Sequence, residues 1–432
     1  MEDIKLEQFN NIHFIGIGGI GISAIARMLL LLGKNVSGSD SGRSPVTEKL
    51  EREGAAVYEG HDARNLKDDT DLVVYTIAIA KDNPELLEAQ KRGVTLLTYP
   101  EALGLLTSAK KTIAVAGTHG KTTTTAMIAE VLMGQNMDPT VVVGSFLNNQ
   151  KENFIGGASN LMVVEACEYC DSFLNLHPFI GVITNIDSDH LDYFGSLENI
   201  QKSFRKFAER IPNDGYLVCN PNDENVKPIL EGLSSTIIDY SEMGEDIELS
   251  VPGKHNIKNA QAALSASMLV GVTQEKGKAN IKTFKGTWRR QEFKGETKKG
   301  ALIYDDYAHH PQEVAAVIEA FKSLYPDKKV SLVFQPHLYS RTKLLFDDFV
   351  KELSNADGVM LAPIYAAREK KDDTISSKMI EEEINKKEHK AIYVETPDEM
   401  VEKLKEWSDD DDVVITVGAG DIYKVGERLL EN

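Results

Sequence analysis

Short runs of β-branched and aliphatic residues alternate with longer amphipathic stretches along most of this chain. The runs at 12–15 and 36–39 have the pattern of buried strands, and residues 21–32 between them have the apolar spacing of a helix that ends before Gly33. Strands that alternate with helices in this way are typical of parallel sheets covered by helices. The pattern therefore predicts an α/β fold made of βα units.

The βα pattern falls into three segments. The first adds a strand at 72–76 and a helix at 102–109 and ends near residue 108, where a new strand at 112–116 begins. The second continues with predicted strands at 162–165, 181–185 and 216–219 and predicted helices at 197–210 and 255–270. The polar stretch 294–300 contains two glycines and indicates a linker at the second domain boundary.

The pattern becomes regular again beyond this predicted linker. The strand candidates of the third segment are 302–304, 330–334, 359–362, 391–394 and 413–417. We therefore predict domains over residues 1–107, 108–298 and 299–432. A chain of 432 residues agrees with three domains at about 150 residues each.

The net charge of the chain argues against polyanionic binding partners. The chain has 48 basic and 67 acidic residues, a net charge of −19, which disfavours binding to nucleic acid or to an anionic membrane. Three cysteines are too few for a disulfide scaffold, and the longest aliphatic run, 28–32, is far shorter than the ~20 residues of a membrane span. No secretory signal pattern is visible at the start. We expect a cytoplasmic protein without membrane insertion, and the composition indicates no particular oligomeric state.

A glycine-rich loop follows the first predicted strand. Gly16-Ile-Gly-Gly-Ile-Gly21 matches G-x-G-x-x-G, in which glycines let the backbone approach a pyrophosphate at a helix N-terminus. Asp40 ends the next predicted strand, where a carboxylate can accept a hydrogen bond from a ribose hydroxyl. The loop predicts a nucleotide diphosphate site. The same glycines would also serve a tight strand–helix turn, and a nicotinamide dinucleotide stays open as the ligand.

A second loop of phosphate-binding type follows the strand at 112–116. Gly117-Thr-His-Gly-Lys-Thr122 ends in G-K-T, as P-loops do, but has two residues between its glycines instead of four. Backbone N–H groups can still face phosphate oxygens, Lys121 adds a positive charge, and the Thr122 hydroxyl can ligate Mg²⁺. Two phosphate-type loops in one chain indicate two phosphate-bearing ligands and disfavour a simple dehydrogenase.

Polar residues at the ends of neighbouring strands supply candidate metal ligands. Glu165 ends one predicted strand and His190 follows another, so both should emerge at the same sheet edge as Lys121. Cys167 and Cys170 form a C-x-x-C, but no second pair of metal ligands accompanies them. We interpret the two cysteines as ordinary thiols.

Two further segments have a structural and a functional interpretation. His255, Asn256 and Asn259 lie where a predicted helix begins, and they either cap it or line a purine. Arg289 and Arg290 lie beside the predicted linker, and they are either surface charges or groups that reach a transferring phosphate. Neither interpretation is favoured by these residues alone.

Three loops at predicted strand ends of the last segment collect histidine, arginine and carboxylate groups. They span residues 305–311, 335–342 and 418–421. Open α/β sheets place their sites at the carboxyl ends of strands. Three histidines and an arginine on two of these loops therefore predict a site at this sheet edge.

Taken together, these motifs resemble those of the Mur ligases of peptidoglycan synthesis, over residues 12–423. The two most specific are Gly117-Thr-His-Gly-Lys-Thr122 and Asp305-Asp-Tyr-Ala-His-His-Pro311. The others are His13-Phe-Ile-Gly-Ile-Gly-Gly-Ile-Gly21, Thr184-Asn-Ile-Asp187 with Asp189-His190, His255-Asn256 with Asn259-Ala260, and Val417-Gly-Ala-Gly-Asp421.

The resemblance implies a fold and an activity. The fold would have a Rossmann-like N-terminal domain for a UDP-sugar, a central P-loop-type ATPase domain and a Rossmann-like C-terminal domain. With ATP and Mg²⁺, such an enzyme would activate the lactyl carboxylate of UDP-N-acetylmuramate as an acyl phosphate. The amine of L-alanine would then attack the acyl phosphate to give the amide, ADP and phosphate in cell-wall precursor synthesis.

The resemblance also implies residues for each ligand. For ATP they are Gly117, Thr118, His119, Gly120, Lys121, Thr122, Thr123, His255, Asn256, Asn259, Arg290 and Asp306. For the UDP-sugar they are Gly18, Gly19, Ser39, Asp40, His61, Thr76 and Ile79. For Mg²⁺ they are Thr122, Glu165 and His190, and for L-alanine and the acyl phosphate Tyr307, His309, His337 and Arg341. The implied catalytic set is Lys121, His190, Arg290, His309, His337 and Arg341.

The chain departs from the family pattern at several of these motifs. Cys167 and Cys170 stand where acidic residues are usual, so Glu165 and Glu168 are the carboxylates left in that stretch. The other departures are Tyr99-Pro100 in place of Arg-Ala, Gln291 in place of phenylalanine and Leu338 in place of arginine. The last change leaves Arg341 as the expected anion contact of its loop.

Three other functions fit part of the motif set. A sibling ligase that attaches a murein tripeptide to the same UDP-sugar would share all the loops. A nicotinamide-dependent oxidoreductase would use the first loop and Asp40 but leave the second loop without a role. A P-loop regulatory protein would use ATP as a switch without ligating anything. The two specific loops favour a ligase over the oxidoreductase and the regulatory protein. Between the two ligases, the compactness of the chain favours the small amino acid L-alanine.

Overall fold

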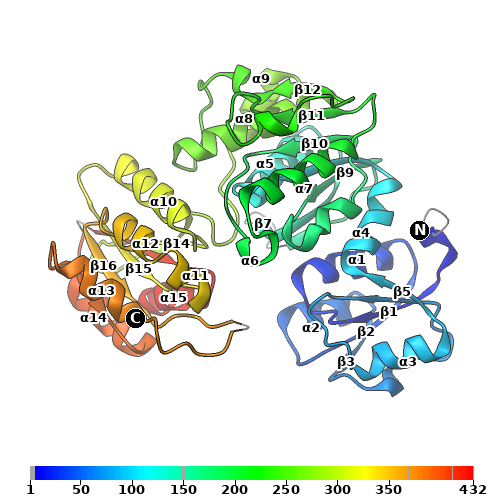
Figure 1. The fold of residues 1–432 in the computed structure, drawn as a ribbon, viewed down its shortest axis with the longest axis horizontal. Helices are drawn as coiled ribbons and strands as arrows, with labels where there is room; N and C mark the ends of the chain where they lie inside the picture. The colour runs from blue at the N-terminus through cyan, green and yellow to red at the C-terminus, as the bar shows by residue number, and fades with distance from the viewer. Residues whose placement is uncertain (1–4, 148–151, 368, 411, 432) are drawn as a thin grey trace. The chain divides into compact units, whose positions relative to one another are not determined.

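The computed structural model describes residues 5–147, 152–367, 369–410 and 412–431. Three sheets follow one another along the chain, and helices connect their strands (Figure 1). The predicted α/β fold with three domains is therefore confirmed. By its internal contacts the chain forms two compact units, Met1–Glu248 with Lys258–Thr283, and Leu249–Ile257 with Phe284–Asn432. The first unit contains the first two sheets and the second unit contains the third.

The first sheet has five parallel strands in the order β3-β2-β1-β4-β5. Its strands are β1 (Asn11–Ile15), β2 (Asn35–Asp40), β3 (Ala56–Glu59), β4 (Leu72–Tyr75) and β5 (Thr95–Thr98). Its helices are α1 (Ile20–Leu31), α2 (Pro45–Arg52), α3 (Pro84–Arg92) and α4 (Tyr99–Ser108). The strand order reverses between β1 and β4, which is the point of the carboxyl edge where α/β sheets of this kind bind their ligands.

The second sheet has seven strands in the order β12-β11-β10-β6-β9-β7-β8, with only β8 antiparallel to its neighbour. They are β6 (Lys111–Ala116), β7 (Thr140–Leu147), β8 (Glu152–Ile155), β9 (Leu161–Glu165), β10 (Ile180–Ile183), β11 (Tyr216–Cys219) and β12 (Thr236–Asp239). The helices are α5 (Lys121–Gly134), α6 (Leu191–Phe194), α7 (Leu197–Glu209), α8 (Lys254–Met268) and α9 (Gln274–Ile281).

The first two sheets share a continuous apolar core, which joins them into one unit. Helix α1 packs against β7 and β8. Arg27 on α1 forms an ion pair with Glu152 at 2.6 Å, and the amide of Asn153 donates to the carbonyl of Ile20. These contacts hold the start of α1, and with it the first glycine-rich loop, against the second sheet.

The third sheet has six strands in the order β13-β14-β18-β15-β16-β17. They are β13 (Glu292–Glu296), β14 (Leu302–Asp306), β15 (Lys329–Phe334), β16 (Gly358–Leu361), β17 (Ala391–Tyr393) and β18 (Asp412–Val417). The helices are α10 (Pro311–Leu324), α11 (Tyr339–Leu344), α12 (Phe346–Leu353), α13 (Ser377–Asn385), α14 (Pro397–Trp407) and α15 (Tyr423–Glu431). Apolar clusters cover both faces of this sheet.

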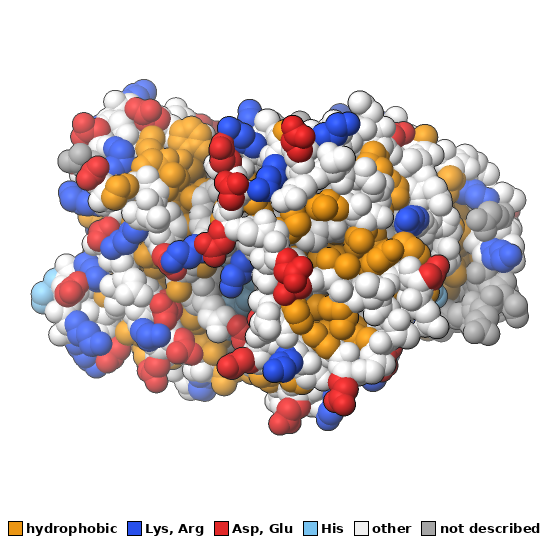
Figure 2. Space-filling view, turned by 90° about the horizontal axis from the view of Figure 1, so that it is seen from above, with side chains coloured by type: hydrophobic (Ala, Val, Ile, Leu, Met, Phe, Trp, Pro, Cys, Tyr) orange, Lys and Arg blue, Asp and Glu red, His pale blue; other side chains and the backbone are white. Residues whose placement is uncertain are grey.

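Short 3₁₀ helices complete the described elements. They are η1 (Leu6–Gln8), η2 (Ala63–Asn65), η3 (Tyr169–Asn175), η4 (Lys227–Ile229) and η5 (Tyr240–Met243). Within the described ranges, no helix is long and apolar enough to cross a membrane. On the face drawn in Figure 2, acidic and basic side chains lie among one another and between apolar patches.

The structure corrects the predicted linker at 294–300. Residues 292–296 form β13, which pairs antiparallel with β14, so the third sheet begins before residue 299. The stretch is polar because β13 is an edge strand of the sheet, where polar and charged side chains are common. The domain ranges 1–107, 108–298 and 299–432 stay predictions, although the pairing of β13 with β14 puts residues 292–296 in the third sheet. Strands β3, β5, β7, β8 and β12 also escaped the sequence pattern.

Candidate active site

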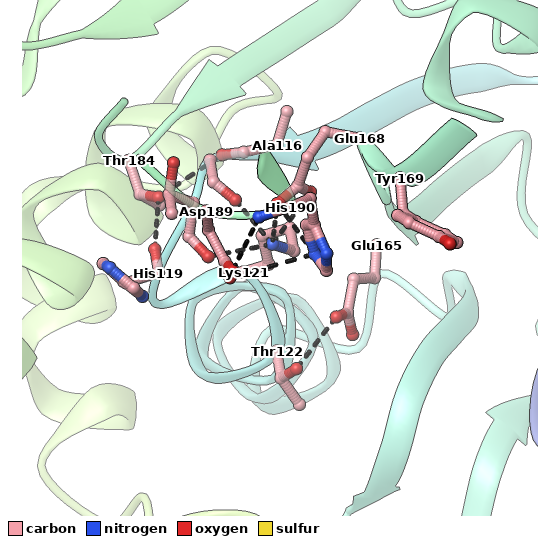
Figure 3. A network of polar contacts seen from close by, with 12 residues as sticks. Ala116, His119, Lys121, Thr122, Glu165, Glu168, Tyr169, Thr184, Asp189 and His190 are labelled. Carbon is pink, nitrogen blue, oxygen red and sulfur yellow. Dashed lines mark hydrogen bonds and ion pairs between the residues drawn. The ribbon is translucent and has the colours of Figure 1, made fainter. Parts of the chain in front are cut away.

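Glycines at both ends shape the loop between β6 and α5. Gly117 and Gly120 have φ values of 140° and 82°, and a Cβ at Gly117 would lie 1.9 Å from Thr184 Oγ1. The Thr184 hydroxyl donates to the carbonyl of His119 at 2.6 Å, and the N–H of His119 donates to Asn185 Oδ1 at 2.9 Å. The loop after β10 thus holds the phosphate-type loop against the start of α5 (Figure 3). Free N–H groups at a helix N-terminus favour an anion there.

Lys121 begins α5 and bends back over this loop. Its Nζ donates to the carbonyls of Gly117 at 2.6 Å and Thr118 at 3.0 Å, and lies 2.9 Å from the buried carboxylate of Glu168. Burial works to lower the pKa of Lys121, but the negative charge of Glu168 outweighs it and raises the pKa above its ordinary value. The ammonium group is therefore charged where phosphate would bind. Thr123 is buried in the first turn of the same helix.

Thr122 and Glu165 form an oxygen pair beside the loop. The Thr122 hydroxyl donates to Glu165 Oε1 at 2.9 Å (Figure 3). The N–H of Gly144 donates to Glu165 Oε2 at 2.7 Å. Among the described residues, no group of three or more His, Cys, Asp or Glu side chains is arranged to hold a metal ion. Mg²⁺ commonly takes one or two protein oxygens and completes its shell with water and phosphate. The Thr122–Glu165 pair fits that chemistry.

His190 lies near Glu168, the ion-pair partner of Lys121. Its Nε2 is 4.0 Å from Glu168 and 3.8 Å from Asp189, and its ring centroid is 4.9 Å from that of Tyr169. The backbone of His190 has a φ of 51°, which turns the chain sharply before α6. The contacts group His190 with Glu168 and Lys121, and its role as a metal ligand stays a prediction.

The residues predicted for the UDP-sugar gather at the carboxyl edge of the first sheet. The N–H of Gly18 donates to Asp40 Oδ2 at 2.8 Å, and the N–H of Gly16 donates to the carbonyl of Ser39 at 2.8 Å. A Cβ at Gly16 would lie 2.6 Å from Thr76 and 3.8 Å from Ile79. Asp40 therefore shapes the glycine loop itself, a role that its position after a strand did not indicate.

Two more predicted residues of this edge are joined to each other. Ser39 Oγ lies 2.8 Å from Nδ1 of His61 and 2.6 Å from the carboxylate of Glu85. Ser39 and Glu85 are completely buried. Gly19 closes the loop by donating its N–H to the carbonyl of Gly16 at 3.2 Å. Sequence reasoning missed Glu85.

Tyr99, the first residue of α4, packs against the end of the first glycine-rich loop. A Cβ at Gly21, in the first turn of α1, would lie 2.7 Å from the Tyr99 hydroxyl oxygen. Burial, together with the nearby Cys167 and Glu165, raises the pKa of Tyr99. The phenol therefore packs against the first glycine-rich loop, and the charge of Glu165 acts on it. The departure at position 99 was the signal that could have singled it out.

The second unit brings together the four residues predicted for L-alanine. The ring centroid of His309 lies 5.4 Å from that of Tyr307 and 5.8 Å from that of His337. The guanidinium of Arg341 lies 3.1 Å from Nδ1 of His337. Leu338, with a φ of 69°, turns the chain between them. The clustering predicted for this sheet edge is present.

The arginine pair divides into one buried and one partly buried side chain. Arg289 is 2% exposed and donates to Asp305 at 2.8 Å and to the carbonyls of Gly420 and Gly418 at 2.7 Å and 2.5 Å. The guanidinium groups of Arg289 and Arg290 each lie 5.2 Å from the ring centroid of Tyr307. Arg289 is therefore a buried structural residue, contrary to the surface-charge interpretation, whereas Arg290 is only partly buried beside the same ring.

Asp306, predicted to contact ATP, is 5% exposed. Its carboxylate accepts the backbone N–H groups of Gln291 at 2.8 Å and Ala308 at 2.7 Å. Burial raises its pKa to about 6, although Arg290 acts in the opposite direction. Asp306 thus fixes the backbone around Arg290.

The three residues predicted near a purine belong to different units. His255 accepts from the amide of Gln291 at 3.3 Å, and Asn256 donates to that same amide at 3.0 Å. Burial lowers the pKa of His255 to about 4, so the ring is neutral and can accept. Asn259 lies in the other unit, where a Cβ at Gly120 would be 2.3 Å from its Oδ1. The joint purine contact stays a prediction.

Comparison with known proteins gives matches along nearly the whole chain. Successive family models match: the Mur ligase family catalytic domain at 11–111, the Mur ligase middle domain at 115–246 and the Mur ligase glutamate ligase domain at 289–420. A UDP-N-acetylmuramate–L-alanine ligase of Clostridium acetobutylicum is 42% identical, over 99% of both chains.

Solved structures show the same likeness. The UDP-N-acetylmuramate-alanine ligase of Thermotoga maritima has a TM-score of 0.79 and 28% identity, over 98% of both chains. A murein peptide ligase of Psychrobacter arcticus has a TM-score of 0.69 and 22% identity, also over 98% of both, which is a likeness of fold.

Proposed function

Since this chain belongs to the Mur ligase family, we propose that it joins L-alanine to the lactyl carboxylate of UDP-N-acetylmuramate with the cleavage of ATP. The full-length curated relative at 42% identity carries that activity in its name. The observation that carries the proposal is the charged Lys121 over the phosphate-type loop, in the same unit as a second glycine-rich loop. One loop is suited to ATP and the other to the diphosphate of the sugar nucleotide.

The reaction needs both loops because a carboxylate and an ammonium group do not condense at neutral pH. A carboxylate oxygen of the substrate attacks the terminal phosphorus of ATP, the bond from that phosphorus to ADP breaks, and an acyl phosphate forms. The nitrogen of L-alanine, after losing a proton, then attacks the acyl carbon. The tetrahedral intermediate expels phosphate and leaves the amide.

The first-unit residues act on the phosphates. Lys121 neutralises charge on the transferring phosphoryl group, and the N–H groups at the start of α5 hold the neighbouring oxygens. Thr122 and Glu165 would hold Mg²⁺, which when bound offsets further phosphate charge. Glu168 keeps the ammonium of Lys121 in place before ATP arrives.

The second-unit cluster is suited to the amino acid. Arg341 offers a guanidinium to the α-carboxylate of L-alanine, and the His309 and His337 imidazoles, when neutral, can take up a proton from its ammonium group. Arg290 and Asp306 supply the neighbouring charge and backbone support. We also propose a cytoplasmic location, because the reaction draws on ATP and a sugar nucleotide.

Phosphate release tests this function. The full-length protein is mixed with ATP, Mg²⁺ and UDP-N-acetylmuramate, and release is compared with L-alanine, with the tripeptide L-Ala-γ-D-Glu-diamino acid, and with neither. Release that needs both the sugar nucleotide and L-alanine is expected. Release only with the tripeptide would assign the sibling activity instead, and no release in any mixture would overturn the ligase proposal.

The other candidate functions lack support of this kind. The likeness to the murein peptide ligase is one of fold, at 22% identity. A nicotinamide oxidoreductase would leave the Lys121 loop and the histidine cluster without a role. A switch protein would hydrolyse ATP without regard to the sugar nucleotide, and the same assay would show that.

A further inference from the structure

The buried carboxylate of Glu85 contacts Ser39, one of the residues predicted to bind the UDP-sugar. Glu85 is completely buried in the first turn of α3, which is capped by the side chain of Asn83 and begins at Pro84. Burial by itself raises the pKa of Glu85, but hydrogen bonds from the surrounding donors outweigh it and hold the pKa below its ordinary value. The side chain is therefore a carboxylate anion at neutral pH, and it can only accept hydrogen bonds.

Four donors converge on the two oxygens of this carboxylate. Oε1 accepts from the amide of Asn65 at 2.7 Å and from the backbone N–H of Asp62 at 3.1 Å. Oε2 lies 2.6 Å from the hydroxyl of Ser39 and 3.2 Å from Nε2 of His13. The Oε1 donors cannot be reversed, because a backbone N–H and an amide NH₂ only donate. The Oε2 partners, a hydroxyl and an imidazole, can each donate or accept.

The hydroxyl of Ser39 carries this constraint outward to His61. A serine hydroxyl has one proton, and Ser39 donates it in a hydrogen bond to the carboxylate of Glu85 at 2.6 Å. The oxygen of Ser39 must then accept at its second contact, the Nδ1 of His61 at 2.8 Å. Neutral His61 is thereby held with its proton on Nδ1. Its Nε2 keeps a lone pair, on a ring whose side chain is 21% exposed whereas Ser39 and Glu85 are buried.

We propose that Glu85 is a positioning residue of the UDP-sugar site, which acts through Ser39 to fix His61 as the Nδ1–H tautomer and so to present its Nε2 as a hydrogen-bond acceptor. The ligand group it selects is a donor of the nucleotide, either a ribose hydroxyl or the N–H of uracil. The proposal rests on the proposed function, which supplies the sugar nucleotide as the ligand.

Glu85→Gln tests the relay because an amide has one end that donates. An NH₂ group at the Oε1 position would face two irreversible donors, so it must take the Oε2 position. There it donates to Ser39, the serine proton turns to Nδ1 of His61, and the neutral ring takes the Nε2–H tautomer. The acceptor toward the nucleotide becomes a donor, and we expect the KM for UDP-N-acetylmuramate to rise about tenfold or more, with kcat and the KM for ATP unchanged.

Two readouts separate positioning from a merely structural role. Long-range ¹H–¹⁵N spectra of the ¹⁵N-histidine-labelled protein at alkaline pH report the tautomer of each of the ten histidines, with His61→Gln used to assign the signal. The matched control is Asp71→Asn, whose carboxylate accepts the backbone N–H groups of Asn10 and Asn11 at 2.8 Å and 3.1 Å, next to the first residue of β1. It should change neither the tautomer nor the KM.

Each outcome decides the proposal. An Nδ1–H tautomer in the parent protein that inverts in Glu85→Gln, together with the raised KM, supports it. An Nε2–H tautomer in the parent, or an unchanged tautomer and KM in the variant, overturns it. If Glu85→Gln fails to fold, Ser39→Ala removes the relay and leaves the carboxylate, and His61 should then populate both tautomers. The tautomer is read without substrate, so absence of ligase activity would refute the proposed function alone.

Discussion

Replacing Lys121 by methionine gives the sharpest test of the phosphate site, because it removes a charge and keeps the length of the side chain. The Nζ of Lys121 lies 2.6 Å from the carbonyl of Gly117 and 2.9 Å from Glu168, so the ammonium group is already in contact with the phosphate-type loop. A phosphate oxygen bound by the loop would come to lie a few ångströms from this ammonium group.

The size of the effect follows from Coulomb's law. Two unit charges about 4 Å apart interact by about 4 kcal/mol at the effective dielectric constant of ~20 that suits protein sites. Since about 1.4 kcal/mol corresponds to a factor of ten, kcat/KM for ATP should fall about a thousandfold in Lys121→Met. The KM for UDP-N-acetylmuramate should change by less than about threefold, because the first glycine-rich loop is untouched.

Stability must be measured beside activity, since the variant leaves the buried Glu168 without its ammonium partner. Breaking such a pair costs about 3 kcal/mol of unfolding free energy. The double variant Lys121→Met with Glu168→Gln should recover that stability in urea titrations while phosphate release stays low. Lys110→Met is a matched control, because Lys110 donates to the carbonyl of Ser159 at the opposite end of β6. Lys121→Met with kcat/KM within tenfold of the parent would refute the phosphate-site reasoning.

Three further predictions concern the metal pair, the two arginines and a buried aspartate. Thr122→Val removes the hydroxyl that donates to Glu165, so the Mg²⁺ concentration for half-maximal phosphate release should rise about tenfold; an unchanged Mg²⁺ titration would exclude Thr122 from the metal site. Arg289→Met breaks a buried ion pair and should lower the unfolding free energy, measured by urea titration, by about 3 kcal/mol. Arg290→Met should change the unfolding free energy by less than about 0.5 kcal/mol but should lower phosphate release. Equal stability losses in the two variants would contradict this difference. Burial raises the pKa of Asp306 from 3.8 to about 6, so between those pH values the folded protein binds more protons than the unfolded chain. The unfolding free energy should therefore fall as the pH rises from about 4 to 6, by at most about 3 kcal/mol. Asp306→Asn should remove this part of the pH dependence in urea titrations.

The loops were predictable because their chemistry is local. The glycines of Gly117–Thr122 are set by the backbone turn between one strand and one helix, and Lys121 and Thr122 follow within two residues. The same holds for Gly16–Gly21 at the start of α1. Alternating strands and helices likewise predicted three α/β domains, since parallel sheets require helical crossovers. Edge strands such as β13 escaped because their polar side chains lack the apolar signal.

The partners of these residues were decided by the tertiary structure alone. Lys121 meets Glu168 across 47 residues, and Ser39 meets Glu85 across 46. Arg289 and Arg290 have the same side chain, and the sequence does not show that Arg289 is the one that meets Asp305 and the carbonyls of Gly418 and Gly420, about 130 residues away. A strand order that interleaves distant segments brings such groups together. The sequence by itself therefore determined the fold class and the chemistry of each loop, whereas the sheet topology determined which side chains hold the reacting groups in place, because a parallel sheet places its neighbouring strand ends far apart along the chain.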